Sequence, residues 1–379
     1  MNKRLHKGKL IQVTLAGTLT LAIVMGIGRF SYTPIFPLMQ KAFPFSDAHA
    51  GFLASSNYLG YLLGALFAGV IRWGEKKIYY LKVYLVLNIA STMAMAISTQ
   101  FVLWLLFRFL SGITSGLVFV LVSSILLDFL TQQKQSSWSG YFFSGTGWGI
   151  ALTGVLVPIL AAHYTWAGAW MGLGIISIIL AVYIFNVIKQ KTISPCNEQG
   201  KIQDNTRLAY KPDTGQGHHK KVLFWLILAY GCEGLGYIIT GTFLVAMVEK
   251  TSVFEHASMI SWTLVGLAAI PSCLLWAKLG ERWGKLMALM LAYVVQAVGI
   301  SLPILSGHVA AISLGALLFG GTFMGITTLA VSLARQLFPQ ESNRPIGYLT
   351  AAYGVGQIVG PALAGIFISL TGNYLFAVL

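Results

Sequence analysis

The chain has 379 residues and a formal net charge of +14, and it is 56% hydrophobic but only 9% charged. Because soluble domains carry about 25% charged residues, this composition argues against a soluble domain and indicates a membrane protein. The three cysteines, Cys196, Cys232 and Cys273, have no paired spacing, which argues against a disulfide framework and a cysteine-based zinc site.

Apolar runs recur along the whole chain at the length that crosses a bilayer, about 18 to 25 residues in a helix. We place eleven complete spans, at residues 11–38, 48–71, 78–98, 101–127, 138–162, 165–188, 221–247, 257–279, 284–305, 308–335 and 346–371. The first run is too long and too often interrupted by polar residues for a signal peptide. The chain ends at Leu379 as a twelfth apolar run begins, so we expect an incomplete twelfth helix.

Charge orients these spans. Of the 25 lysines and arginines, 21 fall in the N-terminus and in the loops on the same side of the membrane, and only Lys41 and Lys250 lie on the other side. The positive-inside rule therefore predicts a cytoplasmic N-terminus. Membrane orientation explains the net charge, and no basic segment with interleaved aromatic residues suggests a nucleic-acid partner.

A long polar connection, residues 189–220, separates the sixth span from the seventh. Its charge and its lack of apolar periodicity predict a solvated linker. We therefore divide the chain into an N-terminal half of six spans, residues 1–188, this cytoplasmic linker, and a C-terminal half, residues 221–379. The linker's histidine pair, His218 and His219, has no ligand partners at metal-site spacing, so we predict no metal site.

The two halves repeat each other with an offset of about 208 residues. Gly26-x-Gly28 recurs as Gly234-x-Gly236, Gly112 and Gly116 recur as Gly321 and Gly325, Gly140-Tyr141 recurs as Gly347-Tyr348, and Arg72-Trp73-Gly74 recurs as Arg282-Trp283-Gly284. Each match falls at the same place in the order of helices. Six spans per half make the repeat parallel, which predicts an all-α major-facilitator-type fold of two pseudo-symmetric six-helix halves.

The chain resembles the major facilitator superfamily, and within it the YbfB/YjiJ-type bacterial transporters. The resemblance rests on the segments GIGRFSYTPIFPLMQ at 26–40, SSNYLGYLLGAL at 55–66 and GLGYIITGTFL at 234–244. The superfamily's loop motif matches residues 277–285 but has lost its acid in the first-half copy, residues 69–77. The fifth-span antiporter motif, residues 145–154, is partial, with Ile150 in place of proline.

The resemblance implies a cytoplasmic gate at the loop motif. We assign to this gate Glu281, Arg282 and Lys285, together with Asp128 at the inner end of the fourth span. The alternative for Asp128 is plain solvation.

Three charges lie inside spans: Arg29, Arg108 and Glu233, in spans 1, 4 and 7. These spans line the central cavity in the family that the chain resembles. A charge inside a bilayer is costly and marks a functional site unless it has a structural partner. The arginines either bind an anionic group of the substrate and tune Glu233, or donate to backbone carbonyls freed by nearby glycines.

For Glu233 the two interpretations are a proton carrier and a structural salt bridge. Burial favours the neutral form of a carboxyl group and a nearby arginine favours the charged form, so a carboxyl group whose surroundings alternate can bind and release a proton. We expect Arg29 and Glu233 to approach each other across the cavity, directly or through water.

Uncharged polar side chains in the spans are weaker candidates. We assign substrate contact to Tyr32, Asn57, Tyr58, Tyr237, Thr240 and Gln357. Such side chains also form hydrogen bonds between helices without any role in binding. The Gly112/Gly116 and Gly321/Gly325 spacings are typical of close helix packing.

These features predict a secondary transporter, in the plasma membrane, that moves a small organic solute by alternating access of two halves. We expect proton coupling, with efflux slightly favoured over uptake. The alternative is an organic-anion uptake symporter or uniporter that uses the cavity arginines. A membrane-embedded enzyme is disfavoured because the spans contain no nucleophile or metal cluster. The expected partners are a small-molecule substrate, protons and lipid; we expect a monomer and no cofactor.

Overall fold

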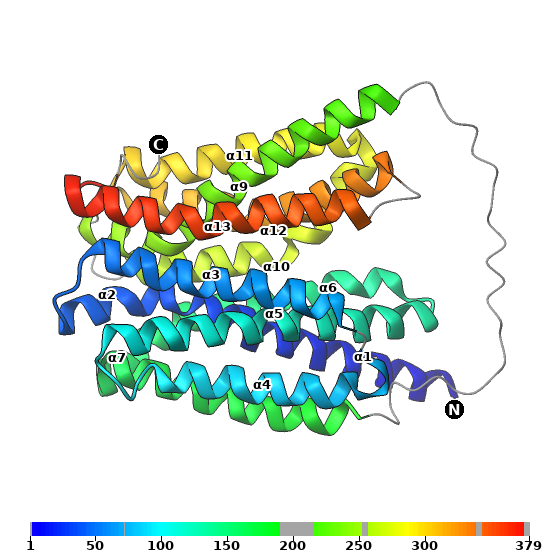
Figure 1. The fold of residues 1–379 in the computed structure, drawn as a ribbon, viewed down its shortest axis with the longest axis horizontal. Coiled ribbons are helices and arrows are strands. Elements are labelled where there is room, and N and C mark those ends of the chain that lie inside the picture. Colours follow the sequence, from blue (N-terminus) through cyan, green and yellow to red (C-terminus); the bar gives the residue numbers. More distant parts are fainter. Residues whose placement is uncertain (1, 72, 190–215, 252–256, 339–342, 375–379) are drawn as a thin grey trace.

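The computed structural model describes residues 2–71, 73–189, 216–251, 257–338 and 343–374. In these residues the chain forms helices and the turns between them. Figure 1 shows the helices side by side, with α1–α7 in one group and α9–α13 in the other. The all-α class expected from the sequence is therefore confirmed.

The first half contains the helices α1 (Asn2–Leu21), α2 (Tyr32–Ala42), α3 (Asp47–Val70), α4 (Lys77–Ala94), α5 (Phe101–Gln132), α6 (Ser139–Phe143) and α7 (Gly145–Val187). A π-helix, η1 (Ala22–Phe30), joins α1 to α2, and two short 3-10 turns, η2 (Gly74–Lys76) and η3 (Ser136–Trp138), precede α4 and α6. The second half contains α9 (Gln216–Thr251), α10 (Ala257–Trp283), α11 (Lys285–Leu305), α12 (Val309–Leu337) and α13 (Asn343–Thr371).

The eleven predicted spans correspond to these helices, with two refinements. The first span is not one regular helix, because its middle is the π-helix η1. The fifth span comprises α6 and the first part of α7, and the sixth span is the rest of α7. The two spans are separated at Thr165, whose φ of 63° and ψ of −171° are not helical. Residues 375–379, where the twelfth span was expected to continue, and the linker residues 190–215 lie outside the described residues.

Nine helices in the described part of the chain are long and apolar enough to cross a membrane. This number treats α1 to α2 as one segment and α6 to α7 as another. The helix α4 is not among them, because Lys77 and Lys82 near its start lower its mean hydropathy.

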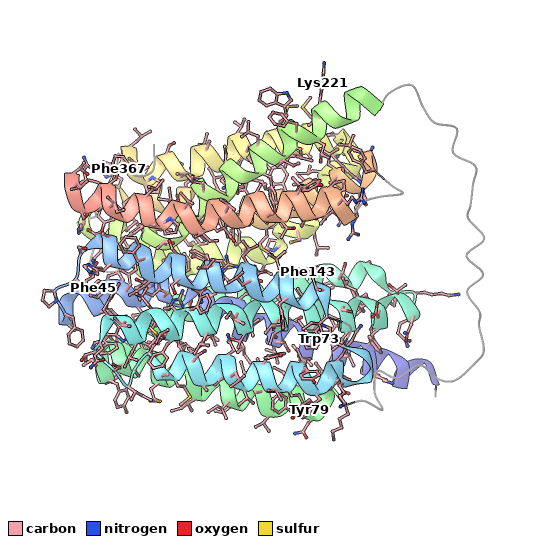
Figure 2. All side chains as sticks on the ribbon, in the orientation of Figure 1. Phe45, Trp73, Tyr79, Phe143, Lys221 and Phe367 are labelled. Carbon is pink, nitrogen blue, oxygen red and sulfur yellow. The ribbon has the colours of Figure 1, made fainter. Side chains whose placement is uncertain are left out.

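We call the end of the bundle where α1 begins the N-terminal face, and the opposite end the far face. In Figure 2, Trp73 and Lys221 lie toward the N-terminal face, and Phe45 and Phe367 lie toward the far face. The interface between the halves is formed by α3 against α13 and by α7 against α10. Glycines allow the backbones to touch there: Gly51 lies against the carbonyl of Pro361, and Gly266 lies against Ala151.

The predicted repeat is visible in equivalent contacts. Gly26 packs against Gly149 in the first half, and their equivalents Gly234 and Gly356 pack together in the second half. Lys77 Nζ donates to Ser124 Oγ at 3.1 Å, and the equivalent Lys285 Nζ donates to the Ser332 carbonyl at 3.2 Å. Gly112 and Gly116 also pack against the backbone of α3, as expected for close-packing glycines.

Candidate functional site

The first span is built around the π-helix η1, which carries Arg29. A π-helix shifts its backbone hydrogen bonds by one residue, which leaves some carbonyls without a regular partner. Side chains of α5 supply those partners: Ser115 Oγ donates to the Val24 carbonyl at 2.9 Å, and Ser111 Oγ donates to the Gly28 carbonyl at 3.0 Å. The serines of α5 therefore stabilise the irregular part of the first span.

Arg108 completes this support. Its Nη1 donates to the Gly28 carbonyl at 3.0 Å, and its Nη2 donates to the Arg29 carbonyl at 3.2 Å. The guanidinium also lies over the ring of Tyr32, 4.7 Å from the ring centre. This geometry matches the interpretation in which an arginine donates to carbonyls freed beside glycines, so Arg108 holds the backbone around Arg29.

Arg29 itself has a different environment. Its side chain is only 2% exposed, and its guanidinium lies 4.3 Å from the ring centre of Tyr61 and 4.6 Å from that of Tyr58. The Nε and Nη2 atoms have no hydrogen-bond partner in the part of the chain that the structure describes. Cation–π contact offsets part of the cost of burying this charge, but two donors remain available for an acceptor.

A column of aromatic rings from the second half leads toward this arginine. Tyr230 stacks on Tyr353 with ring centres 4.4 Å apart, Tyr353 stacks on Tyr237 at 5.4 Å, and Tyr237 stacks on Phe323 at 5.7 Å. Phe30, the residue after Arg29, meets Phe323 edge-on at 6.5 Å. The column therefore connects the interior of the second half to the π-helix of the first.

Sequence reasoning had singled out Tyr58 and Tyr237 but not Tyr61, Tyr230 or Tyr353. A signal was present for Tyr61, because it follows Tyr58 by three residues and so shares a face of α3. Tyr61 is partly exposed, and its ring lies against the Arg29 guanidinium.

Glu233 is buried in the second half and does not meet Arg29. Its Oε1 accepts a hydrogen bond of 2.7 Å from Gln296 Nε2 of α11. Among the described residues no ion pair joins Arg29 to Glu233, so this conformation lacks the direct form of the approach that was expected directly or through water. The repeat places Glu233 level with Met25, but the π-helix changes the direction in which the residues after Met25 project. Both charges lie inside the bundle, with exposures of 2% and 8%.

The remaining substrate candidates are buried, and most make bonds between helices. Asn57 Nδ2 donates to the Arg108 carbonyl at 2.9 Å, and Tyr32 OH donates to the Ala50 carbonyl at 2.9 Å. Tyr58 OH lies 3.5 Å from Thr242 Oγ1 in the other half, and Gln357 Nε2 donates to Tyr237 OH at 2.5 Å. Thr240 Oγ1 is buried without a partner in the described chain.

The predicted gate residues lie at the N-terminal face, Asp128 near the end of α5 and the other three where α10 ends and α11 begins. Asp128, Glu281 and Arg282 are exposed. None of them takes part in the ion pairs found among the described residues. Lys285 donates within its own half, to Ser332. In this conformation these residues make no charged contact between the halves.

Charged contacts between the halves lie instead at the far face. Lys41 pairs with Glu249, and Lys250 Nζ lies 3.7 Å from Asp47 Oδ2. Tyr374 OH donates to Asp47 Oδ1 at 3.1 Å. Burial and the neighbouring Asp47 carboxylate raise the pKa of the Tyr374 hydroxyl, which therefore stays a neutral donor.

Burial along the first helix of each half follows the same pattern. Residues 20–37 of the first span and residues 237–248 of α9 are buried on all sides, whereas both helices have exposed positions nearer the N-terminal face. Thr33 Oγ1 donates to the Gly241 carbonyl at 2.5 Å where these two helices meet. The molecule is therefore closed at the far face.

Comparison with known proteins supports a transporter fold. The chain is 23% identical to a gentisate transporter of Corynebacterium glutamicum, covering 89% of this chain and 77% of that protein. It is 25% identical to a hexuronate transporter of Bacillus subtilis, covering 89% of this chain and 83% of that protein.

Among solved structures, the nucleoside transporter NupG aligns with a TM-score of 0.69 at 14% identity, covering 98% of this chain and 95% of that one. An inward-facing, unoccupied bacterial homolog of the human lysosomal transporter Spinster also aligns with a TM-score of 0.69 at 14% identity, covering 96% of this chain and 82% of that one. The major-facilitator fold expected from the sequence is therefore confirmed.

A family model described as "Uncharacterised MFS-type transporter YbfB" matches residues 21–379. This match spans nearly the whole chain and includes η1, Arg108 and Glu233. The protein is therefore a multi-pass membrane transporter of the major facilitator superfamily, and it belongs to the YbfB family.

Proposed function

We propose that this transporter binds the carboxylate of a small organic anion at Arg29 and carries it across the membrane by alternating access. The observation that carries the proposal is the buried Arg29 guanidinium, whose Nε and Nη2 atoms have no hydrogen-bond partner among the described residues. A planar guanidinium binds a carboxylate through two parallel hydrogen bonds. The alternative role of an arginine, donation to the backbone, is already filled by Arg108.

Two of the relatives support an anionic substrate. The names of the gentisate and hexuronate transporters are those of organic acid anions. In this chain, the aromatic rings of Tyr58 and Tyr61 beside Arg29 would face the body of such a solute. These observations favour the organic-anion alternative over general efflux.

The closed far face supports an alternating-access cycle. With the N-terminus in the cytoplasm, as the charge distribution of the loops indicates, the far face is the outer face of the plasma membrane. The two halves then separate at the outer face, where Lys41 and Glu249 part, to reach the opposite state. Movement of the partly exposed Tyr61 ring would open Arg29 to a solute entering from the cytoplasmic side.

Binding to purified protein tests the anion site. The probes are an aromatic carboxylate, a uronate, and neutral analogues in which an amide or alcohol replaces the carboxylate. We expect Arg29→Ala to weaken carboxylate binding by about 10- to 100-fold, the equivalent of about 1.5–3 kcal/mol for a charge-assisted hydrogen bond.

Lys9→Ala is the matched control, because it removes one exposed positive charge far from the site. Arg29→Lys should recover only part of the affinity, since an ammonium group lacks the planar fork. Equal carboxylate affinity in wild type and Arg29→Ala would reject the site.

A second part of the proposal assigns proton coupling to Glu233. The supporting observation is a buried carboxylate whose partner among the described side chains is a neutral amide, Gln296, rather than an arginine. A buried carboxyl group without an ionic partner gains and loses a proton easily when its surroundings change.

A further inference from the structure

A groove of about 380 Å³ lies between α10, α11 and α12 in the second half, and its lining includes neither Arg29 nor Glu233. Leu275 and Leu279 of α10, Val295 of α11 and Gly321 of α12 form its apolar walls, and its lining includes two cations, Lys278 and Arg282. The two cations are four residues apart on α10, so they lie one above the other on the same side of the helix.

The polar groups in the floor of the groove are already used. The Gly321 carbonyl accepts from Trp276 Nε1 at 2.7 Å and from Ser272 Oγ at 2.8 Å. Thr322 Oγ1 donates to the Leu318 carbonyl at 2.8 Å. The floor therefore offers an apolar surface to an occupant, and the charge of the groove comes from its two cations.

The groove opens toward lipid. Ile260, Leu267 and Leu275 lie along one side of α10 with exposures of 48%, 45% and 54%, which is the pattern of a helix face that contacts acyl chains. Trp283, the last residue of α10, is 51% exposed and is the kind of residue that marks the membrane–water interface. Arg282 therefore lies at the depth of lipid headgroups, and Lys278 lies one turn deeper.

The first half has no equivalent cation. The repeat aligns Lys278 with Val70, which is 83% exposed, and the neighbouring positions Ala68 and Gly69 are also uncharged. Lys278 therefore adds about 1 kcal/mol of attraction to an anionic lipid surface in the second half only.

We propose that this groove binds an anionic phospholipid, with its phosphate between Lys278 and Arg282 and one acyl chain along Leu275 and Val295. Charge complementarity favours an anionic lipid. Neither Lys278 nor Arg282 forms an ion pair within the described residues, and the nearest acid in the sequence, Glu281, does not line the groove. The apolar walls and the saturated floor exclude a hydrophilic solute. This site is independent of the proposed substrate.

Native mass spectrometry of the purified full chain with phosphatidylglycerol or phosphatidylcholine tests the proposal. We expect one phosphatidylglycerol molecule to be retained preferentially over phosphatidylcholine. Lys278→Gln together with Arg282→Gln should weaken that retention by about tenfold or more, since two headgroup-level cations are removed. The matched control is Lys9→Gln with Lys134→Gln, which removes the same charge from exposed positions outside the groove.

A second variant tests the acyl-chain half of the site while leaving both cations in place. An added Cβ at Gly321 meets no atom closer than Ala268 Cβ at 4.0 Å, so Gly321→Val has room to extend into the groove. We expect this variant to fold and to lose preferential retention of phosphatidylglycerol. Unchanged retention in the double variant, equal retention of phosphatidylcholine by wild type, or full competition by inorganic phosphate would overturn the proposal.

Discussion

The first helices of the two halves are equivalent in the repeat but differ in structure and in charge. The first span contains the π-helix η1 and carries Arg29, whereas α9 is a continuous α-helix and carries Glu233. In both halves an amide side chain of the third span contacts the first span. Asn88 of α4 lies against Gly28, and Gln296 of α11 donates to Glu233. The same scaffold therefore presents a cation in one half and a carboxyl group in the other.

The fourth helices explain the difference in structure. Arg108, Ser111 and Ser115 of α5 donate to carbonyls of η1. The repeat aligns these three residues with Leu317, Gly320 and Met324 of α12, whose side chains have no strong donor. A π-helix at the equivalent place in α9 would leave buried carbonyls unsatisfied, so a regular α-helix is favoured there.

The difference in charge predicts the largest effect, on coupling. We expect Glu233→Gln to abolish accumulation driven by a pH gradient and to preserve substrate exchange at equal pH, because glutamine keeps the shape of the side chain but cannot bind a proton. Paired transport assays in proteoliposomes measure both. Driven accumulation at the wild-type rate would remove the proton role from Glu233 while leaving the Arg29 site untouched.

The difference in structure predicts the next effect, on stability. Arg108→Leu places in α5 the residue that α12 has at the equivalent position. The variant loses two hydrogen bonds from a charged donor, each worth about 1.5–3 kcal/mol. The Gly28 carbonyl keeps its hydrogen bond from Ser111, whereas the Arg29 carbonyl loses its side-chain donor, so we expect the variant to lose about 3 kcal/mol of stability. It should also lose carboxylate binding, because Arg29 is no longer held in place.

Thermal unfolding followed by tryptophan fluorescence measures this loss. Leu317→Ala is the control, because its side chain is 41% exposed and supports no backbone group. A thermal midpoint for Arg108→Leu equal to that of the control would show that the π-helix does not depend on the hydrogen bonds that Arg108 donates.

Much of the fold could be predicted from the sequence because it depends on long-range patterns. Span length, the distribution of basic residues between loops and the glycine repeat each depend on many residues, so one unusual residue does not change them. Together they predict the spans and their division into two halves. The sequence also offered the interpretation of Arg108 that the structure shows, donation to backbone carbonyls, since a glycine-rich backbone beside a buried arginine has free carbonyls.

The site could be predicted only in part because its geometry depends on one helical irregularity. The helix propensities of Ala22–Phe30 do not distinguish a π-helix from an α-helix. The side chains that stabilise the π-helix lie on another span, α5. The expected approach of Arg29 and Glu233 assumed a regular first helix, because the repeat alone aligns Glu233 with Met25, one turn before Arg29. The cross-half charges Lys41 and Glu249 were likewise missed, since the family motif directs attention to the opposite face.

The smallest effect that we predict separates the two halves at a single repeated glycine. A Cβ added at Gly28 lies 2.7 Å from Asn88 Oδ1, and the Asn88 amide is held by hydrogen bonds to Ser111, Thr114 and Ser115, so it cannot withdraw freely. Overpacking of this kind costs about 1–3 kcal/mol. We therefore expect Gly28→Ala to lower the thermal midpoint and to weaken carboxylate binding at the neighbouring Arg29.

Gly236, the equivalent glycine, has no atom within 4 Å of an added Cβ. Alanine there gains helix propensity, which is worth up to about 1 kcal/mol relative to glycine. The same substitution should therefore raise stability in α9 and lower it in η1. Because both changes add one methyl group at equivalent positions, opposite signs can come only from the different surroundings of the two first helices, and equal signs would contradict the structural difference from which the two roles are derived.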